Sequence, residues 1–160
     1  MRLARIDRTL EKCEEHLSDT DAFGTEIESL LTQSLLVIMC AEFERKIKEL
    51  IREKCSSVED ESIVEFMESC INAVFRSIRV NEISGLLNPY KERFTQKIMD
   101  NKIQETLYSN IITNRNQVAH AEGSNATFKD VKEFYEEGHI VLDFFSEALL
   151  EDDTDSSSGS

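Results

Sequence analysis

The chain has little of what an all-β fold needs. Its 160 residues include five glycines and one proline, whereas all-β domains join many short strands through turns rich in Gly and Pro. Hydrophobic residues make up 40% of the sequence and charged residues 31%, a composition typical of a folded, soluble domain. The length suits a single domain with a core of its own. Long helices joined by short loops therefore fit best.

The sequence also lacks a long hydrophobic run. The longest apolar stretch extends from Leu35 to Ala41, whereas about 20 apolar residues are needed to cross a bilayer. The first residues, Met1 to Asp7, are amphipathic and have no apolar core of the kind found in a secretory signal. We therefore expect no membrane partner and a cytoplasmic protein.

Cysteine is present, but not at the spacing of a metal or redox site. Cys13, Cys40, Cys55 and Cys70 are widely separated, with no Cys-x-x-Cys pair. None of them is paired with a histidine at the spacing of zinc ligands. Three of the four fall at apolar positions of expected helices, so we interpret them as buried, reduced thiols. We expect no metal site and no cofactor.

Positive charge is scarce overall and unevenly distributed. With 18 Lys and Arg against 32 Asp and Glu, the net charge is −14, which argues against nonspecific binding to nucleic acid or to an anionic membrane. Residues 76–115, however, contain seven positive and four negative side chains, or 7 − 4 = +3. The remainder of the chain then carries a net charge of −17. Only this middle span can offer a mildly positive surface.

Hydrophobic spacing predicts an all-α fold, an up-and-down bundle of four to six helices. We expect one helical domain over residues 1–150, followed by a disordered acidic, Ser- and Gly-rich tail over 151–160. The middle of the second helix, Leu30 to Phe43, is apolar on nearly every face and should be buried at the centre. The expected helical segments are residues 2–18, 22–54, one that starts near 56–60, a short one within 79–88, 89–99, 101–120 and 127–149.

Several side chains outside any motif are interpreted as structural. Glu42 and Glu44 are expected to pair with Lys46 and Lys48 at four-residue spacing. His139 lies among apolar residues and is expected to pack at the edge of the core. Capping signals are expected at five helix starts, namely Asp19 to Asp21, Ser56 to Asp60, Asn88 before Pro89, Asp100 or Asn101, and Thr127 with Asp130. The third helix is expected to bury Ile63, Val64, Phe66, Met67, Cys70, Ile71, Val74 and Phe75.

Side chains that can transfer a proton and bind a phosphate lie close together at the end of the 101–120 helix. Asn116 and His120 are four residues apart and share a helical face, and Arg115 can reach round from one turn away. Histidine, with an ordinary pKa of about 6.5, can accept or donate a proton near neutral pH. Arginine can hold a phosphate and stabilise charge that builds on its oxygens. Taken alone, the same pattern also fits a helix end at which Arg115 and His120 satisfy the last carbonyls.

The motif and its surroundings resemble the HEPN domains (higher eukaryote and prokaryote nucleotide-binding domains). Their mark is an Arg followed, after four to six residues, by a His, usually with a polar residue directly after the Arg. The sequence here is Arg115-Asn116-Gln117-Val118-Ala119-His120. The long helix that contains Leu36 to Glu44 is similar to the branch grouped with the HEPN part of ribonuclease L, the RiboL-PSP-HEPN branch. The resemblance covers roughly residues 25–148.

This resemblance implies a helical bundle that dimerises so that two motifs face each other. Active members are metal-independent endoribonucleases, in which Arg115 and His120 would be catalytic and Asn116 would support them. The 2′-hydroxyl of RNA would attack the phosphate and leave a 2′,3′-cyclic phosphate and a 5′-hydroxyl. Such a protein would serve as a toxin or an anti-phage defence component, held in check by an antitoxin or another regulatory protein.

Two alternatives stay open at this point. The first is a non-catalytic HEPN-like dimer that binds a protein or a nucleotide and cuts nothing. The second is a helical interaction protein in which Arg115 and His120 only cap a helix. Loss of RNA cleavage in a folded His120→Ala variant separates the enzyme from both.

Overall fold

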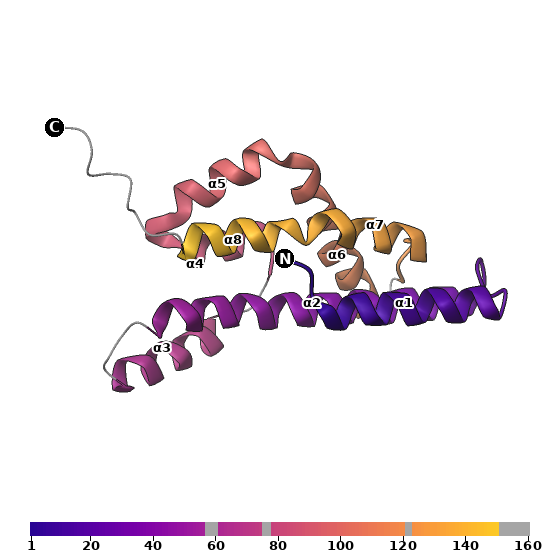
Figure 1. Cartoon of the computed structure of the whole chain (residues 1–160), viewed down its shortest axis with the longest axis horizontal. Coiled ribbons are helices and arrows are strands. Elements are labelled where there is room, and N and C mark those ends of the chain that lie inside the picture. Colours follow the sequence, from indigo (N-terminus) through magenta and orange to yellow (C-terminus); the bar gives the residue numbers. More distant parts are fainter. Residues whose placement is uncertain (57–60, 75–77, 121–122, 151–160) are drawn as a thin grey trace.

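The computed structural model describes residues 1–56, 61–74, 78–120 and 123–150. These ranges contain helices and no strands, which confirms the predicted all-α fold (Figure 1). The helices outnumber the predicted four to six, partly because the last predicted helix is divided at His139. Their bounds are α1 Ala4–Asp19, α2 Glu26–Cys55, α3 Glu61–Val74, α4 Val80–Leu86, a 3-10 turn Asn88–Tyr90, α5 Lys91–Asp100, α6 Lys102–Ala119, α7 Phe128–Gly138 and α8 Ile140–Leu150.

Helix α2 is the element on which most of the others pack. Its 30 residues make it about 45 Å long at 1.5 Å per residue, and α1, α6, α7 and α8 all contact it. In Figure 1, α1 and α2 run lengthwise, α7 and α8 form a rod above them, and α5 lies above that rod. At the centre, the ring of Phe43 stacks on Tyr108 of α6, with 5.4 Å between centroids. The core therefore lies between α2 and the pair α6–α7.

A glycine permits the close packing of α6 on α7. A Cβ atom added to Gly138 would lie 2.7 Å from the backbone nitrogen of Tyr108, closer than real Cβ contacts. The next residue, His139, is buried and divides α7 from α8, and its Nδ1 lies 2.8 Å from the carbonyl oxygen of Tyr135. His139 therefore packs in the core, as the sequence suggested. A single turn residue there separates α7 from α8, and the two helices continue in nearly the same direction (Figure 1).

Local capping chemistry explains where two of the helices begin. At α7, Thr127 and Asp130 form the predicted capping box. The predicted start of the second helix after Asp19 to Asp21 is wrong, because those residues end α1 and Asp21 adopts a left-handed φ of 51°. Helix α2 is capped instead by Thr25, whose hydroxyl accepts a hydrogen bond of 3.2 Å from the Ile27 amide. The predicted helix start at 57–60 and the tail 151–160 lie outside the described residues.

Two predictions of burial are wrong. Leu30 and Val37, expected at the buried centre, are 57% and 47% exposed, and Ile63 and Phe66 of α3 are 47% and 69% exposed. Hydrophobic spacing reveals that a helix has an apolar face but not whether a neighbour covers that face. Helix α3 packs chiefly on α2. None of the helices in the described ranges is both long and apolar enough to cross a membrane.

The two glutamates in the middle of α2 differ in their partners. Glu44 pairs with Lys48 at 2.7 Å, as predicted. Glu42 does not pair with Lys46; it is buried and accepts hydrogen bonds from Arg5 at 2.9 Å and Arg45 at 2.7 Å. Burial acts to raise the pKa of Glu42, but the hydrogen bonds and charges of the two arginines outweigh it and lower that pKa. Glu42 therefore joins α1 to α2.

Candidate functional site

The last turns of α6 place two of the three predicted residues together. Nη1 of Arg115 donates a hydrogen bond of 3.2 Å to Oδ1 of Asn116. His120 follows as the C-cap residue of the helix, and its backbone N–H donates to the Asn116 carbonyl at 3.0 Å. The side chains of Arg115 and His120 are exposed, and that of Asn116 is half-buried. The motif therefore marks the end of α6 and faces solvent.

A cavity of about 170 Å³ lies where α6 meets α2. We call it the Arg115 cavity. Arg115 and Asn116 line it, whereas His120 does not. The structure thus gathers the arginine and the amide around one cavity and leaves the histidine at the end of the helix. The remaining lining residues are Val37, Cys40, Ala41, Glu44, Ile78 and Ile112.

The charges around the Arg115 cavity favour an anion. Within the described ranges the guanidinium of Arg115 makes the single hydrogen bond to Asn116 and no ion pair. Glu44, which lines the same cavity, is paired with Lys48. An arginine carries five N–H donors in a planar fork that matches a phosphate or a carboxylate. Most donors of Arg115 are therefore available to a phosphate.

The thiol in the same cavity is unsuited to nucleophilic chemistry. Burial raises the pKa of Cys40 to about 12, although the positive charge of Arg115 acts in the opposite direction. A thiol reacts as its thiolate, and such a pKa leaves almost none at neutral pH. Cys13, Cys40 and Cys55 are free thiols and are buried, as the sequence suggested for cysteines at apolar positions.

Hydrogen bonds fix the segment that follows the motif. Ser124 Oγ donates to Oδ1 of Asn114 at 2.8 Å, and Nδ2 of Asn114 donates to the Asn110 carbonyl at 2.8 Å. Gly123, with a φ of 72°, supplies the left-handed turn that returns the chain toward α6. The sequence indicated this turn through Gly123 and Ser124, but it gave no sign that Asn114 would anchor it.

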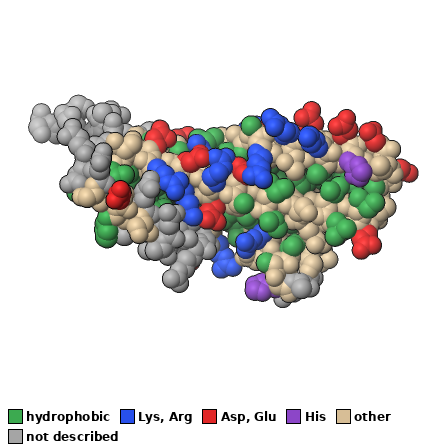
Figure 2. Space-filling model, turned by 90° about the horizontal axis from the view of Figure 1, so that it is seen from below, with side chains coloured by type: hydrophobic (Ala, Val, Ile, Leu, Met, Phe, Trp, Pro, Cys, Tyr) green, Lys and Arg blue, Asp and Glu red, His purple; other side chains and the backbone are tan. Residues whose placement is uncertain are grey.

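An exposed apolar stripe on α2 leads to the Arg115 cavity. We define the α2 stripe as Phe23, Ile27, Leu30 and Val37, all between 47% and 57% exposed. Their spacing of three, four or seven residues places the helical members on one face. Val37 also lines the cavity. In Figure 2, which views the molecule from the side of α1 and α2, hydrophobic side chains gather between groups of Lys, Arg, Asp and Glu.

Sequence reasoning missed the contribution of α2 to the site. Val37, Cys40 and Glu44 recur at helical spacing, so the sequence shows that they share a face. That this face meets Arg115 is a property of how α2 packs on α6. Among the described residues, no three His, Cys, Asp or Glu side chains are grouped so that they could hold a metal ion.

Comparison with known families identifies the domain to which the chain belongs. The sequence model of the family RiboL-PSP-HEPN matches residues 1–151. The chain belongs to this family. The predicted resemblance is therefore confirmed, and the Arg115–His120 segment of this HEPN domain lies inside the matched range. Neither a curated protein nor a solved structure matches the chain.

Proposed function

We propose that this HEPN domain is a metal-independent endoribonuclease whose site is formed by Arg115, Asn116 and His120 of two facing copies. The observation that carries the proposal is the Arg115 guanidinium, which has no ion-pair partner among the described residues and lines a cavity beside Asn116. Membership of the HEPN family supports RNA as the substrate.

The proposed reaction needs a base, an acid and a charge stabiliser. His120 of one copy accepts the proton of the ribose 2′-hydroxyl as its oxygen attacks the phosphorus. The bond from phosphorus to the 5′-oxygen breaks, and the second copy's equivalent histidine donates a proton to that oxygen. The products are a 2′,3′-cyclic phosphate and a 5′-hydroxyl. Arg115 stabilises the charge on the non-bridging oxygens, and Asn116 orients Arg115 through their hydrogen bond.

The α2 stripe supports pairing with a second copy. Two-fold symmetry brings the same patch of each copy together, and exposed apolar patches are typical of interaction sites. Because Val37 belongs both to the stripe and to the Arg115 cavity, a dimer whose two-fold axis passes near Val37 brings its two Arg115 cavities close together. This arrangement supplies the second histidine that one copy lacks.

A protein partner is part of the same proposal. An unrestrained ribonuclease harms its own cell, so a toxin or an anti-phage defence component of this kind is expected to act with an antitoxin or another regulatory protein. The family membership supports this role. The strongly acidic chain, with a net charge of −14, provides a surface that a basic partner can recognise.

The direct test of the chemistry uses labelled RNA in the presence of EDTA. The wild type is expected to cleave it and to leave 2′,3′-cyclic phosphate ends. Arg115→Ala should reduce the rate by about 100-fold or more, the loss typical when a group that stabilises transition-state charge is removed. Arg8→Ala removes an exposed arginine of α1 and serves as the matched control. Equal rates for the two variants would rule out the assigned role of Arg115.

The dimer has a separate test. Val37→Glu places a charge in the α2 stripe and should convert the dimer to a monomer in light scattering, with loss of cleavage. Ile103→Glu changes a side chain that is 69% exposed outside the stripe, and it should leave the mass and the activity unchanged. A Val37→Glu variant that remains dimeric would contradict the proposed interface.

One observation favours a second candidate function. Because the His120 side chain does not line the cavity that holds Arg115 and Asn116, the site of a single copy suits phosphate binding better than proton transfer. A non-catalytic HEPN dimer that binds a nucleotide or a protein fits this geometry. Saturable binding of a nucleotide, without cleavage of any RNA by the wild type, would favour it.

A further inference from the structure

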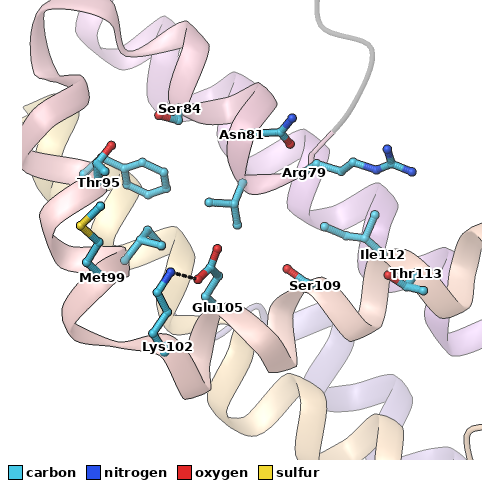
Figure 3. Close-up of a pocket in the computed structure, with 13 residues that line it drawn as sticks. Arg79, Asn81, Ser84, Thr95, Met99, Lys102, Glu105, Ser109, Ile112 and Thr113 are labelled. Atoms are coloured by element: carbon cyan, nitrogen blue, oxygen red, sulfur yellow. Dashed lines mark hydrogen bonds and ion pairs between the residues drawn. The ribbon is translucent and has the colours of Figure 1, made fainter.

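A second cavity, larger than the Arg115 cavity, lies between α4, α5 and α6 (Figure 3). We call it the α4–α6 pocket. Its volume of about 410 Å³ falls within the range of small-molecule sites, roughly 300–1,000 Å³. Phe94 and Ile98 of α5 are buried there and supply apolar walls. In Figure 3, Glu105 and Ser109 point from α6 toward α4, which carries Asn81 and Ser84.

The α4–α6 pocket adjoins the Arg115 cavity. Ile112 lines both of them. Ile78 lines the Arg115 cavity, and the next residue, Arg79, lines the pocket. On α6, Asn116 stands one turn beyond Ile112, and one helical turn advances by about 5.4 Å. Glu105 of the pocket lies ten residues before Arg115 on α6, an advance of about 15 Å at 1.5 Å per residue, which the two long side chains and one nucleotide between them can bridge.

The polar groups of the pocket suit the edge of a flat base. Oε2 of Glu105 accepts a hydrogen bond of 2.7 Å from Lys102, while Oε1 makes no hydrogen bond to any described residue. The Glu105 side chain is 27% exposed, so a ligand can reach it. An ionised carboxylate only accepts hydrogen bonds, and the ammonium group of Lys102 only donates them. The pair thus offers acceptors beside a donor.

Guanine presents the edge that complements this pair most fully. Its N1–H and N2–H₂ groups are adjacent donors that a carboxylate can accept, and its O6 accepts from an ammonium or an amide. Adenine and cytosine each offer one amino donor beside a ring acceptor, and uracil offers one N–H between two acceptors. Apolar walls such as Phe94 and Ile98 can contact the flat face of any base. Discrimination between the bases therefore depends on the hydrogen-bonding groups along the edge of each base.

We propose that the α4–α6 pocket binds the guanine base of the nucleotide next to the phosphate held by Arg115, with Glu105 as the residue that determines specificity. The proposal deepens the RNA cleavage proposed above and rests on it for the identity of the ligand as RNA. Lys102 holds Glu105 in position and donates to O6, and Asn81 lies across the pocket on α4.

Binding of free nucleotides tests the specificity without any need for cleavage. Calorimetry on the full chain compares 5′-GMP with 5′-AMP, 5′-CMP and 5′-UMP. GMP should bind about tenfold more tightly or better, as expected for one well-placed bidentate contact to a base edge. Glu105→Gln should abolish this preference. Glu14→Gln also removes a glutamate from an exposed pair, with Lys132 of α7, and should retain it. Equal binding of the four nucleotides, or a preference unchanged in Glu105→Gln, would overturn the proposal.

Cleavage of defined RNAs separates the pocket from the catalytic proposal. A polyuridine oligonucleotide with one guanine should be cut next to that guanine, and the same chain with adenine in its place should be cut at least several-fold more slowly. If the two RNAs were cleaved at the same rate and position, the pocket would bind free guanine nucleotides instead of RNA. That result would overturn the assignment of the α4–α6 pocket as a substrate site. Preference for GMP without cleavage of any RNA would refute the ribonuclease and support the guanine site.

Discussion

The two faces of α6 differ in what covers them. On one face, Tyr108 and Ile111 are completely buried, and Tyr108 meets Phe43 of α2 and the backbone of Gly138 in α7. On the other face, Ser109 and Asn116 line cavities that open to solvent. One helix thus holds the fold together and presents polar groups to a ligand. Substitutions on the covered face should change stability, whereas substitutions on the open face should change binding or cleavage.

Gly138→Ala should produce the largest loss of stability on the covered face. The added Cβ would lie 2.7 Å from the Tyr108 backbone nitrogen, and backbone atoms cannot move aside as a flexible side chain can. The free energy of unfolding should fall by about 3 kcal/mol, the upper end of the usual range for overpacking. Urea denaturation measures it. Gly85→Ala is the matched control, because its Cβ meets nothing within 4 Å; equal stability of the two variants would contradict the close approach.

Tyr108→Phe should have the next largest effect. The Tyr108 hydroxyl is buried and donates a hydrogen bond of 2.7 Å to the Ile78 carbonyl. Its removal leaves that carbonyl without its partner, which costs about 1–2 kcal/mol of unfolding free energy. Tyr90→Phe, at a half-buried ring beside Lys54, should lose much less. A Tyr108→Phe variant as stable as Tyr90→Phe would show that the hydrogen bond does not hold Ile78 in place.

Gly138 and Tyr108 also show which features of the fold can be predicted from the sequence. The all-α fold, the Thr127–Asp130 capping box and the placement of Arg115 at a helix end all depend on residues within a few positions of each other, and all were predicted. The division of the last predicted helix at His139 was not predicted. It accompanies the contact of Gly138 with Tyr108, a residue 30 positions earlier, and no local pattern encodes such a contact.

The candidate site was predictable only in part, for the same reason. The spacing of Arg115, Asn116 and His120 is visible in the sequence, and so is their resemblance to a HEPN motif. The contribution of Val37 and Glu44 to the Arg115 cavity depends on which face of α2 meets α6. The α4–α6 pocket joins residues from three helices, and its polar members are ordinary Ser, Thr, Asn, Glu, Lys and Arg residues that no motif marks.

Acidification should reveal the role of buried Glu42, with an effect smaller than those of Gly138 and Tyr108. Its folded pKa lies below the ordinary value of 4.5 because Arg45 and Arg5 outweigh the effect of burial. The folded state therefore binds fewer protons than the unfolded state, so the contribution of Glu42 to stability is complete above pH 4.5 and is lost as the pH falls through the lower folded pKa. Thermal unfolding between pH 7 and pH 3 should show a shallower acid limb for Glu42→Gln than for the wild type. If Glu42→Gln and the wild type lost stability with falling pH in the same way, Glu42 would be excluded as the source of the acid destabilisation.

Thr113→Ala should have the smallest effect on stability. Thr113 is exposed and lies on the open face of α6, where it lines the α4–α6 pocket. Surface substitutions away from caps and buried hydrogen bonds usually change the free energy of unfolding by no more than about 0.5 kcal/mol. Denaturation midpoints of this variant and of the wild type should coincide within that range. A loss comparable to that of Tyr108→Phe would mean that the two faces are not distinct.

The most direct test of the proposed activity is the rate of RNA cleavage by His120→Ala in EDTA. His16→Ala serves as its control, because His16 is also exposed and lies in the last turn of α1. General acid–base catalysis contributes about 100- to 10,000-fold to a rate. His120→Ala should therefore cleave at least about 100-fold more slowly than His16→Ala while unfolding at the same temperature. Equal cleavage by the two variants would contradict the assignment of His120 as the catalytic acid and base.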